Sequence, residues 1–155
     1  MISQTAEYAL RSVVCLAACP DSPLTSRQVS RVTQVPVSYL SKVLQALVRA
    51  GIVRSQRGLH GGFSLSKNPG ELTLLEVINS VDPIRLIRKC PLDLEEHGGE
   101  LCPLHRRLND SIKMIEKAYQ ETTVQDLLTD PSPNRPLCDF TAGEKEILNN
   151  VGERG

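Results

Sequence analysis

The chain has 155 residues and a mass of 17.1 kDa, which is room for one compact domain with an appendage but not for two full domains. Apolar residues make up 40% of it, aromatic residues only 3%, and Trp is absent, so we expect an aliphatic core of packed helices. No apolar run approaches the roughly 20 residues that span a bilayer, and the N-terminus lacks a signal-peptide pattern. We therefore expect a cytoplasmic protein without a membrane partner, in which the five cysteines are thiols or metal ligands rather than a disulfide scaffold.

The formal net charge of zero conceals an asymmetry along the chain. Residues 1–67 hold eight Lys and Arg against two acidic residues, a net charge of +6, so residues 68–155 carry −6. Such a split predicts a polyanion-facing N-terminal part joined to an acidic part with another task. Charge alone leaves open the alternative that the basic face is merely solvated.

The first three elements are predicted to be helices. Apolar residues at helical spacing predict one over residues 3–19. Thr25, followed three residues later by Gln28, has the form of a capping box and starts a short helix that runs to about Thr33. After a three-residue turn, Ser38 is expected to cap a third helix with an apolar stripe.

A hairpin and two more helices are predicted to follow. Residues 52–65 place β-branched and alternating residues on either side of a glycine-rich tip, which predicts a β-hairpin. Thr73 and Glu76 predict a second capping box at the start of a helix. Residues 84–102 lack sustained periodicity and are predicted to be a loop, and Pro103 suits the first turn of a long helix.

The long helix carries an apolar seam with alternating steps of four and three residues. The seam packs either on the module of its own chain or on the same helix of a second chain, and we favour the second arrangement, a homodimer. The seam consists of Leu101, His105, Leu108, Ile112, Ile115, Tyr119 and Thr122. The predicted dimer interface consists of Leu108, Ile112, Ile115 and Tyr119.

This order of elements predicts the fold class and the domain organisation. The fold is mainly α with a small β-hairpin wing, a winged helix-turn-helix followed by a long C-terminal dimerisation helix. The second helix of such a pair fits the major groove of DNA, which is about 12 Å wide. The predicted division is a DNA-binding domain over 1–83, a cysteine and histidine loop over 84–102, the dimerisation helix and a short following helix over 103–129, and a tail over 130–155.

The predicted partner is double-stranded DNA, read as a pseudo-palindromic operator by a dimer. Lys42 is the strongest candidate for a contact in the major groove, and Arg57 suits the negative potential of a minor groove. The alternative is that these residues are only the solvated surface of a three-helix core. The predicted DNA-binding residues are Thr25, Ser26, Arg27, Ser38, Tyr39, Ser41, Lys42, Arg57, Gly58, His60 and Gly61.

Four candidate metal ligands, Cys90, His97, Cys102 and His105, lie within sixteen residues of one another. Thiolates and imidazoles on a loop and the start of a helix suit a transition metal or an iron-sulfur cluster. Two thiolates and two imidazoles also satisfy tetrahedral zinc, and a chance grouping is the third interpretation. Cys15 and Cys19, which lie on the first predicted helix, are expected to be core residues.

Three segments together resemble the Rrf2 family of bacterial winged-helix regulators, of the IscR and NsrR type, over about residues 1–128. They are MISQTAEYALRSVV at 1–14, VPVSYLSKVLQ at 35–45 and RGLHGGF at 57–63. The resemblance implies a dimeric, DNA-binding transcription factor whose long helix forms the dimer interface. It also places Ser38, Tyr39, Ser41 and Lys42 among the readers of bases and backbone, and Arg57 in the minor groove.

The same resemblance implies an iron-sulfur cluster in the cysteine and histidine loop. Many cluster-binding members carry three evenly spaced loop cysteines; Cys90 and Cys102 match the outer two, and Glu96 stands at the middle position. The missing cysteine argues against a [4Fe-4S] cluster and favours [2Fe-2S], with zinc or no metal as the alternatives. The implied ligands are Cys90, Cys102, His105 and either His97 or Glu7 of the partner subunit.

The sequence thus predicts a transcriptional regulator, most simply a repressor, that senses redox, iron-sulfur or nitrosative status through this centre. The alternative is a metal-free winged-helix regulator or interaction module, with a thiol switch at Cys90 and Cys102 or no sensing centre. An enzyme is not expected, because no nucleophile, base and orienting acid form a recognisable motif and C-x-x-C is absent.

Overall fold

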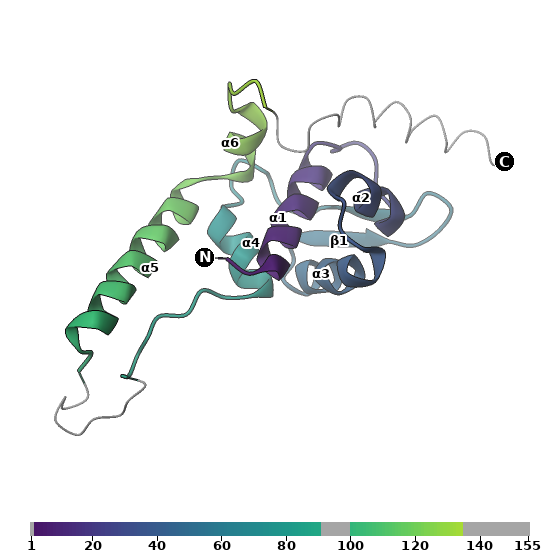
Figure 1. The fold of residues 1–155 in the computed structure, drawn as a ribbon. Helices are drawn as coiled ribbons and strands as arrows, with labels where there is room; N and C mark the ends of the chain where they lie inside the picture. The colour runs from purple at the N-terminus through teal and green to yellow at the C-terminus, as the bar shows by residue number, and fades with distance from the viewer. Residues whose placement is uncertain (1, 91–99, 135–155) are drawn as a thin grey trace.

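Helix α1 lies at the centre of the N-terminal module, with α2, α3, α4, α6 and strand β2 packed around it (Figure 1). The computed structural model describes residues 2–90 and 100–134. Within them, no helix is long and apolar enough to cross a membrane. The predicted mainly helical fold with a two-stranded antiparallel wing is confirmed. The elements are α1 (Gln4–Ala17), α2 (Ser26–Thr33), α3 (Val37–Arg49), β1 (Val53–Gln56), β2 (Gly62–Leu65), α4 (Leu74–Val81), α5 (Pro103–Glu121) and α6 (Val124–Thr129).

The core that the described residues form is aliphatic, as the composition predicts. Buried Ala, Val and Leu from α1 meet Leu40, Leu44 and Leu47 of α3. The aromatic side chains of Tyr8, Phe63 and Tyr119 pack against the edge of this core and are only partly buried. Small and branched side chains let the helices approach closely, so α1 contacts α2, α3, α4 and α6.

The helix pair α2 and α3 is joined by residues 34–36, the predicted three-residue turn. The capping box at the start of α2 is confirmed: the Thr25 hydroxyl accepts from Gln28 N–H, and the Gln28 carboxamide accepts from Thr25 N–H. The expected cap at Ser38 is wrong, because the N-cap of α3 lies two residues earlier. Its N-cap is Pro36, whose carbonyl accepts from the Leu40 N–H at 2.9 Å, so Ser38 lies within the first turn.

The wing is anchored to the module by a second pairing. Strands β1 and β2 pair from Val53 opposite Leu65 to Gln56 opposite Gly62. Leu24, just before α2, pairs with Phe63: each N–H donates to the carbonyl of the other, at 2.9 and 2.8 Å. This close approach requires glycine at position 62, where a Cβ would lie 2.7 Å from the Leu24 carbonyl oxygen.

Helix α4 has only half of the predicted capping box. The Thr73 hydroxyl accepts from the Glu76 N–H at 3.2 Å, as expected. The Glu76 carboxylate does not return to the Thr73 N–H, because it pairs with the ammonium group of Lys67, which the end of the hairpin brings beside it. The second half of that prediction is wrong.

Helix α5 extends away from the module, and the segment after α4 runs out beside it (Figure 1). Its C-terminal end is fixed by backbone hydrogen bonds: Leu74 N–H donates to Thr122, and Val124 N–H donates to Leu72. The short helix α6 then begins with a capping box formed by Thr123 and Asp126.

Candidate DNA-binding surface and candidate metal centre

Helix α3 presents two different faces. Leu40, Val43, Leu44 and Leu47 are buried against the core, whereas Ser38 and Lys42 are exposed on the opposite side. A helix with its apolar face fixed and its polar N-terminal half free has the form of a recognition helix. Lys42 therefore lies where an ammonium group reaches a base edge or a phosphate.

Tyr39 occupies a different environment from Lys42. Its ring lies edge-on to the ring of Tyr8, with the centroids 5.5 Å apart and the planes at 82°. Its hydroxyl lies 3.2 Å from the Thr5 hydroxyl, so the side chain links the start of α3 to α1. Nearby, Ser41 donates to the carbonyl of Val37 in its own helix. Tyr39 is nevertheless exposed, and Ser41 is half-buried.

The residues at the tip of the wing, 57–60, are all exposed. Arg57 and His60 project from a turn in which Gly61 N–H donates to Gly58, whose φ is 112°. Leu59 lies between them and is 94% exposed, the largest exposed fraction among the described large apolar side chains. Sequence reasoning passed over Leu59 because it treated the tip as glycine-rich. Apolar side chains at such positions contact the minor groove in other DNA-binding proteins.

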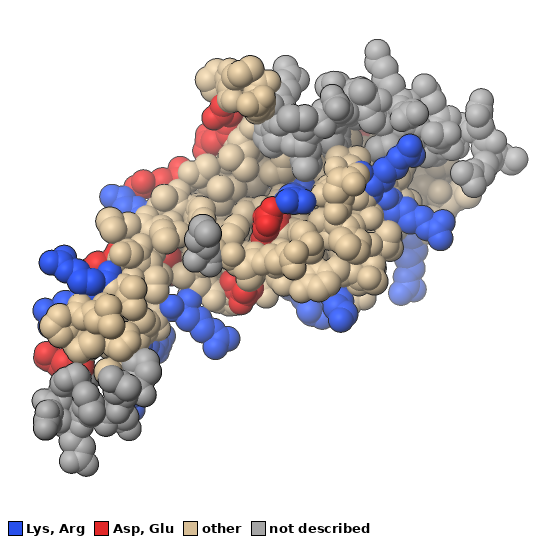
Figure 2. All heavy atoms as spheres, viewed as in Figure 1, with Lys and Arg blue, Asp and Glu red and all other residues tan. Residues whose placement is uncertain are grey.

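The start of α2 places Thr25 and Arg27 at exposed positions, and Ser26 is half-buried. The Thr25 hydroxyl takes part in the capping box of α2. Lys and Arg side chains gather along the part of the surface formed by α2, α3 and the wing (Figure 2). On α1, the Glu7 carboxylate is paired with Arg11.

The structure brings together three of the predicted metal ligands. The sulfur atoms of Cys90 and Cys102 and a ring nitrogen of His105 all lie within 4.8 Å of one another. Cys102 is the N-cap of α5 and His105 lies in its first turn, with the Cys102 sulfur 3.2 Å from His105 Nδ1. The helix N-terminus, with its free N–H groups and positive dipole end, stabilises negative charge on a thiolate.

The other predicted members of the centre are placed less fully. His97 lies outside the described residues, as do Glu96 and Cys138. Glu7 of the same chain lies on α1, where it pairs with Arg11, and does not belong to the three-residue group. Among the described residues, the group thus consists of three donors from one chain.

The other two described cysteines contribute to the core, as expected: Cys15 from α1, and Cys19 from just after the end of that helix. Cys15 is fully buried, and Cys19 is half-buried against the same cluster. Burial raises the pKa of the Cys15 thiol to about 12, and the nearby Cys19 adds to the effect. A thiol that stays protonated at neutral pH is a poor metal ligand.

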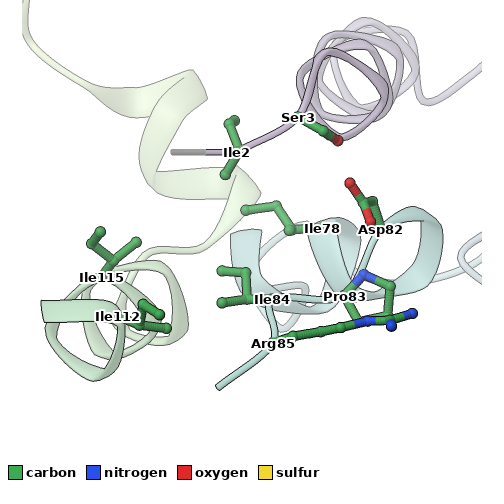
Figure 3. Close-up of a pocket in the computed structure, with 9 residues that line it drawn as sticks. All are labelled: Ile2, Ser3, Ile78, Asp82, Pro83, Ile84, Arg85, Ile112 and Ile115. Atoms are coloured by element: carbon green, nitrogen blue, oxygen red, sulfur yellow. The ribbon is translucent and has the colours of Figure 1, made fainter. Parts of the chain in front are cut away.

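The apolar seam of α5 is divided between two neighbours. Tyr119 packs against the core of its own chain. Ile112 and Ile115 line a pocket of about 260 Å³, across from Ile2, Ile78 and Ile84 (Figure 3). Leu104, Leu108, Met114 and Ile115 are exposed, with exposed fractions of 64%, 45%, 67% and 39%. Leu108 and Ile115 of the predicted interface are therefore exposed, and Leu104, which sequence reasoning missed, lies one helical turn before Leu108.

A model of the Rrf2 family, described as iron-dependent transcriptional regulators, matches residues 2–130. The chain belongs to the Rrf2 family. A relative from Aquifex aeolicus, described as an HTH-type transcriptional regulator, is 28% identical over 131 residues, which are 83% of this chain and 91% of the relative. The predicted family membership is confirmed, and the protein is a DNA-binding transcriptional regulator.

Two solved structures resemble this Rrf2 chain closely in fold. The structure of CymR, the global cysteine regulator of B. subtilis, has a TM-score of 0.65 and 26% identity, covering 82% of this chain and 95% of its own. The structure of T. potens IscR has a TM-score of 0.70 and 20% identity, covering 85% and 88%. At that identity the second likeness shows the fold alone.

Proposed function

We propose that this Rrf2 protein is a homodimeric repressor whose affinity for its operator is set by a metal centre at Cys90, Cys102 and His105. One observation carries the proposal: the donor atoms of Cys90, Cys102 and His105 all lie within 4.8 Å of one another. Cys90 ends the segment after α4, whereas Cys102 stands twelve residues later, at the start of α5. The family description as iron-dependent regulators supports iron as the metal.

The spacing of the three donors fits a single tetrahedral metal ion, and their chemistry also suits an iron-sulfur cluster. Metal bonds of about 2.3 Å to sulfur and about 2.0–2.1 Å to imidazole nitrogen place tetrahedral ligands roughly 3.5–3.8 Å apart. The three donor atoms, all within 4.8 Å of one another, need only small side-chain movements to reach that spacing. Two thiolates and one imidazole suit iron or zinc and disfavour hard cations such as magnesium.

A [2Fe-2S] cluster is the occupant that we propose, with His97 or Glu7 of the partner subunit as the remaining ligand. When bound, the cluster supplies a redox-active, oxidant-sensitive link between the segment after α4 and the start of α5. The alternative occupant is a single zinc ion, which the short spacing of the donor atoms favours. We expect Cys90 to attach the end of the segment after α4 to the cluster, and Cys102 to attach the start of α5 to it.

The path from the centre to DNA runs through α4. The segment that ends in Cys90 begins at the end of α4, and α4 packs against α1, α3 and α5. A change in the position of Cys90 is therefore transmitted to elements that pack against the recognition helix. This is the kind of local event that shifts a two-state regulator.

The dimer is proposed from the outer side of α5. Leu104, Leu108 and Ile115 recur at helical spacing on one side of a helix that extends from the module, and all are exposed. A second copy of this helix covers them in a two-fold arrangement. The two recognition helices then face half-sites spaced by turns of the DNA helix.

The metal content of anaerobically purified protein tests the centre. We expect the parent to be coloured, with about equal iron and acid-labile sulfide, and Cys90→Ala and Cys102→Ala to lose both. Cys19→Ala, outside the group, is the matched control and should keep the cluster. A colourless parent with one zinc per chain would select the zinc site, and a parent without metal would reject the centre.

A thiol switch is the second candidate function, because the sulfur atoms of Cys90 and Cys102 lie within 4.8 Å. An oxidising disulfide reagent would take two electrons from the thiols, which lose two protons and form an S–S bond of about 2.05 Å. Metal-free protein should then change its DNA affinity on oxidation and recover on reduction. The Cys90→Ala variant should show no such change.

A further inference from the structure

Asn109 is the one buried residue among those of α5, with an exposed fraction of 8%. Its side-chain amide makes two hydrogen bonds to the backbone of a single residue, Ile87. The amide nitrogen Nδ2 donates to the Ile87 carbonyl at 2.7 Å, and Oδ1 accepts from the Ile87 N–H at 2.8 Å. The side chain thus satisfies both backbone groups of Ile87, as a neighbouring strand would.

This contact lies beside the three ligand residues on both segments. Asn109 follows His105 by four residues, about one turn of α5, and Ile87 precedes Cys90 by three residues. The segment from α4 carries Cys90, and the helix carries Cys102 and His105. The two hydrogen bonds of Asn109 therefore join the two segments that must meet for the ligands to converge.

The amide also selects one register between these segments. Oδ1 must face the N–H and Nδ2 must face the C=O, so only one orientation satisfies both groups of Ile87. An apolar side chain at position 109 would leave two backbone groups without these partners, which is costly where the site is buried. Packing alone would let the segment slide along α5, whereas the paired hydrogen bonds fix it.

We propose that Asn109 is a positioning residue for the metal centre: it holds Ile87, and through it Cys90, at the distance from Cys102 and His105 that one metal group requires. The inference rests on the proposed function for the identity of the metal group. The placement of Cys90 beside Cys102 and His105 does not depend on that function. Replacing residues that orient the metal ligands without binding the metal typically changes metal affinity 10–100-fold.

Two substitutions separate the contributions. Asn109→Leu removes both hydrogen bonds while keeping a side chain that branches at the same atom. Asn109→Asp keeps the shape and the acceptor for the Ile87 N–H, but replaces the donor with a carboxylate oxygen that faces the Ile87 carbonyl. Asn79→Ala is the matched control, because the Asn79 carboxamide accepts from Ile84 N–H at 3.1 Å in the same segment, but at an exposed site farther from Cys90.

Titration of the reduced, metal-free protein with Co²⁺ measures the positioning, because the absorption of cobalt reports thiolate ligation. We expect Asn109→Leu and Asn109→Asp to bind Co²⁺ at least 10-fold more weakly than the parent, and Asn79→Ala within about 3-fold of it. Equal binding by the parent and a folded Asn109→Asp would overturn the inference. An equal loss in Asn79→Ala would do so too. If Asn109→Leu fails to fold, Asn109→Asp alone decides the outcome.

A metal-free measurement separates this inference from the proposed function. The rate at which a mild oxidant joins Cys90 and Cys102 in a disulfide depends on how often their sulfur atoms meet. The rate should fall at least 10-fold in both Asn109 variants and stay near that of the parent in Asn79→Ala. A parent that binds no metal, together with slow disulfide formation in the Asn109 variants, would refute the metal centre and retain the positioning role. Unchanged rates would overturn the positioning role.

Discussion

Gly62→Ala is predicted to weaken the attachment of the wing. In the structure, a Cβ at this position would lie 2.7 Å from both the carbonyl carbon and the oxygen of Leu24, and 3.0 Å from its nitrogen. These are backbone atoms that cannot rotate away, so strand β2 must move from Leu24. That movement stretches the two hydrogen bonds that join Leu24 and Phe63.

The magnitude follows from those two bonds and from the contact itself. Each backbone hydrogen bond contributes about 1 kcal/mol, and a new methyl group in a packed site costs roughly 1–3 kcal/mol when the backbone shifts only in part. Because shifting the strand relieves the contact while breaking the bonds, the two costs overlap. We expect a loss of about 2–4 kcal/mol in the free energy of unfolding, a large part of the total for a domain of this size.

Urea unfolding followed by circular dichroism measures this loss. Gly70→Ala is the matched control, because a Cβ at position 70 meets only the side-chain oxygen of Asn68, at 3.5 Å. That control should unfold within about 1 kcal/mol of the parent, and a gain is expected if the alanine only restricts the unfolded chain. A Gly62→Ala protein with the urea midpoint of the parent would refute the pairing of Leu24 with the wing.

Three further predictions test the DNA surface, the dimer and a helix cap. Lys42→Ala should weaken operator binding, measured by fluorescence anisotropy, by about 1–3 kcal/mol and, if Lys42 contacts phosphate, reduce the salt slope by about 1. Leu108→Asp should halve the mass seen by light scattering or give insoluble protein, whereas Lys113→Asp, on the other side of α5, should leave the dimer intact. The backbone N–H of Thr123 donates to the Asp126 carboxylate and is the main cause of the lowered pKa of that carboxyl group; the Thr123 hydroxyl donates to it as well. The ionised Asp126 carboxylate therefore contributes to stability at neutral pH, and this contribution is lost as the pH falls through the lowered pKa. Below about pH 4 the urea midpoint of the parent should therefore fall more steeply than that of Asp126→Asn, and equal slopes would contradict this.

Local sequence signals predicted most of the fold because they act within a few residues. The pairing of Thr25 with Gln28 and the apolar stripe of α3 depend on spacing alone, and both are found in the structure. Predictions failed where a distant group intervened. Glu76 has the right spacing for a capping box, but Lys67 from the hairpin takes its carboxylate.

The candidate site shows the same division. The spacing of Cys102 and His105 on one helix turn is a local property, so sequence could place them together. Cys90 reaches them only because Asn109 and Ile87 pair across the two segments, a tertiary contact with no sequence pattern of its own. An asparagine within an amphipathic helix was the single available signal. Likewise, the contact of Tyr39 with Tyr8 depends on how α1 crosses α3.

The operator affinity of one anaerobic protein sample, measured before and after removal of its metal, tests the central claim most directly. An operator selected from a randomised duplex pool serves as the probe in fluorescence anisotropy. We predict that metal removal changes the affinity of the parent at least 10-fold and leaves the affinity of Cys90→Ala unchanged. Equal affinities of metal-loaded and metal-free parent would contradict control of DNA binding by the Cys90, Cys102 and His105 centre.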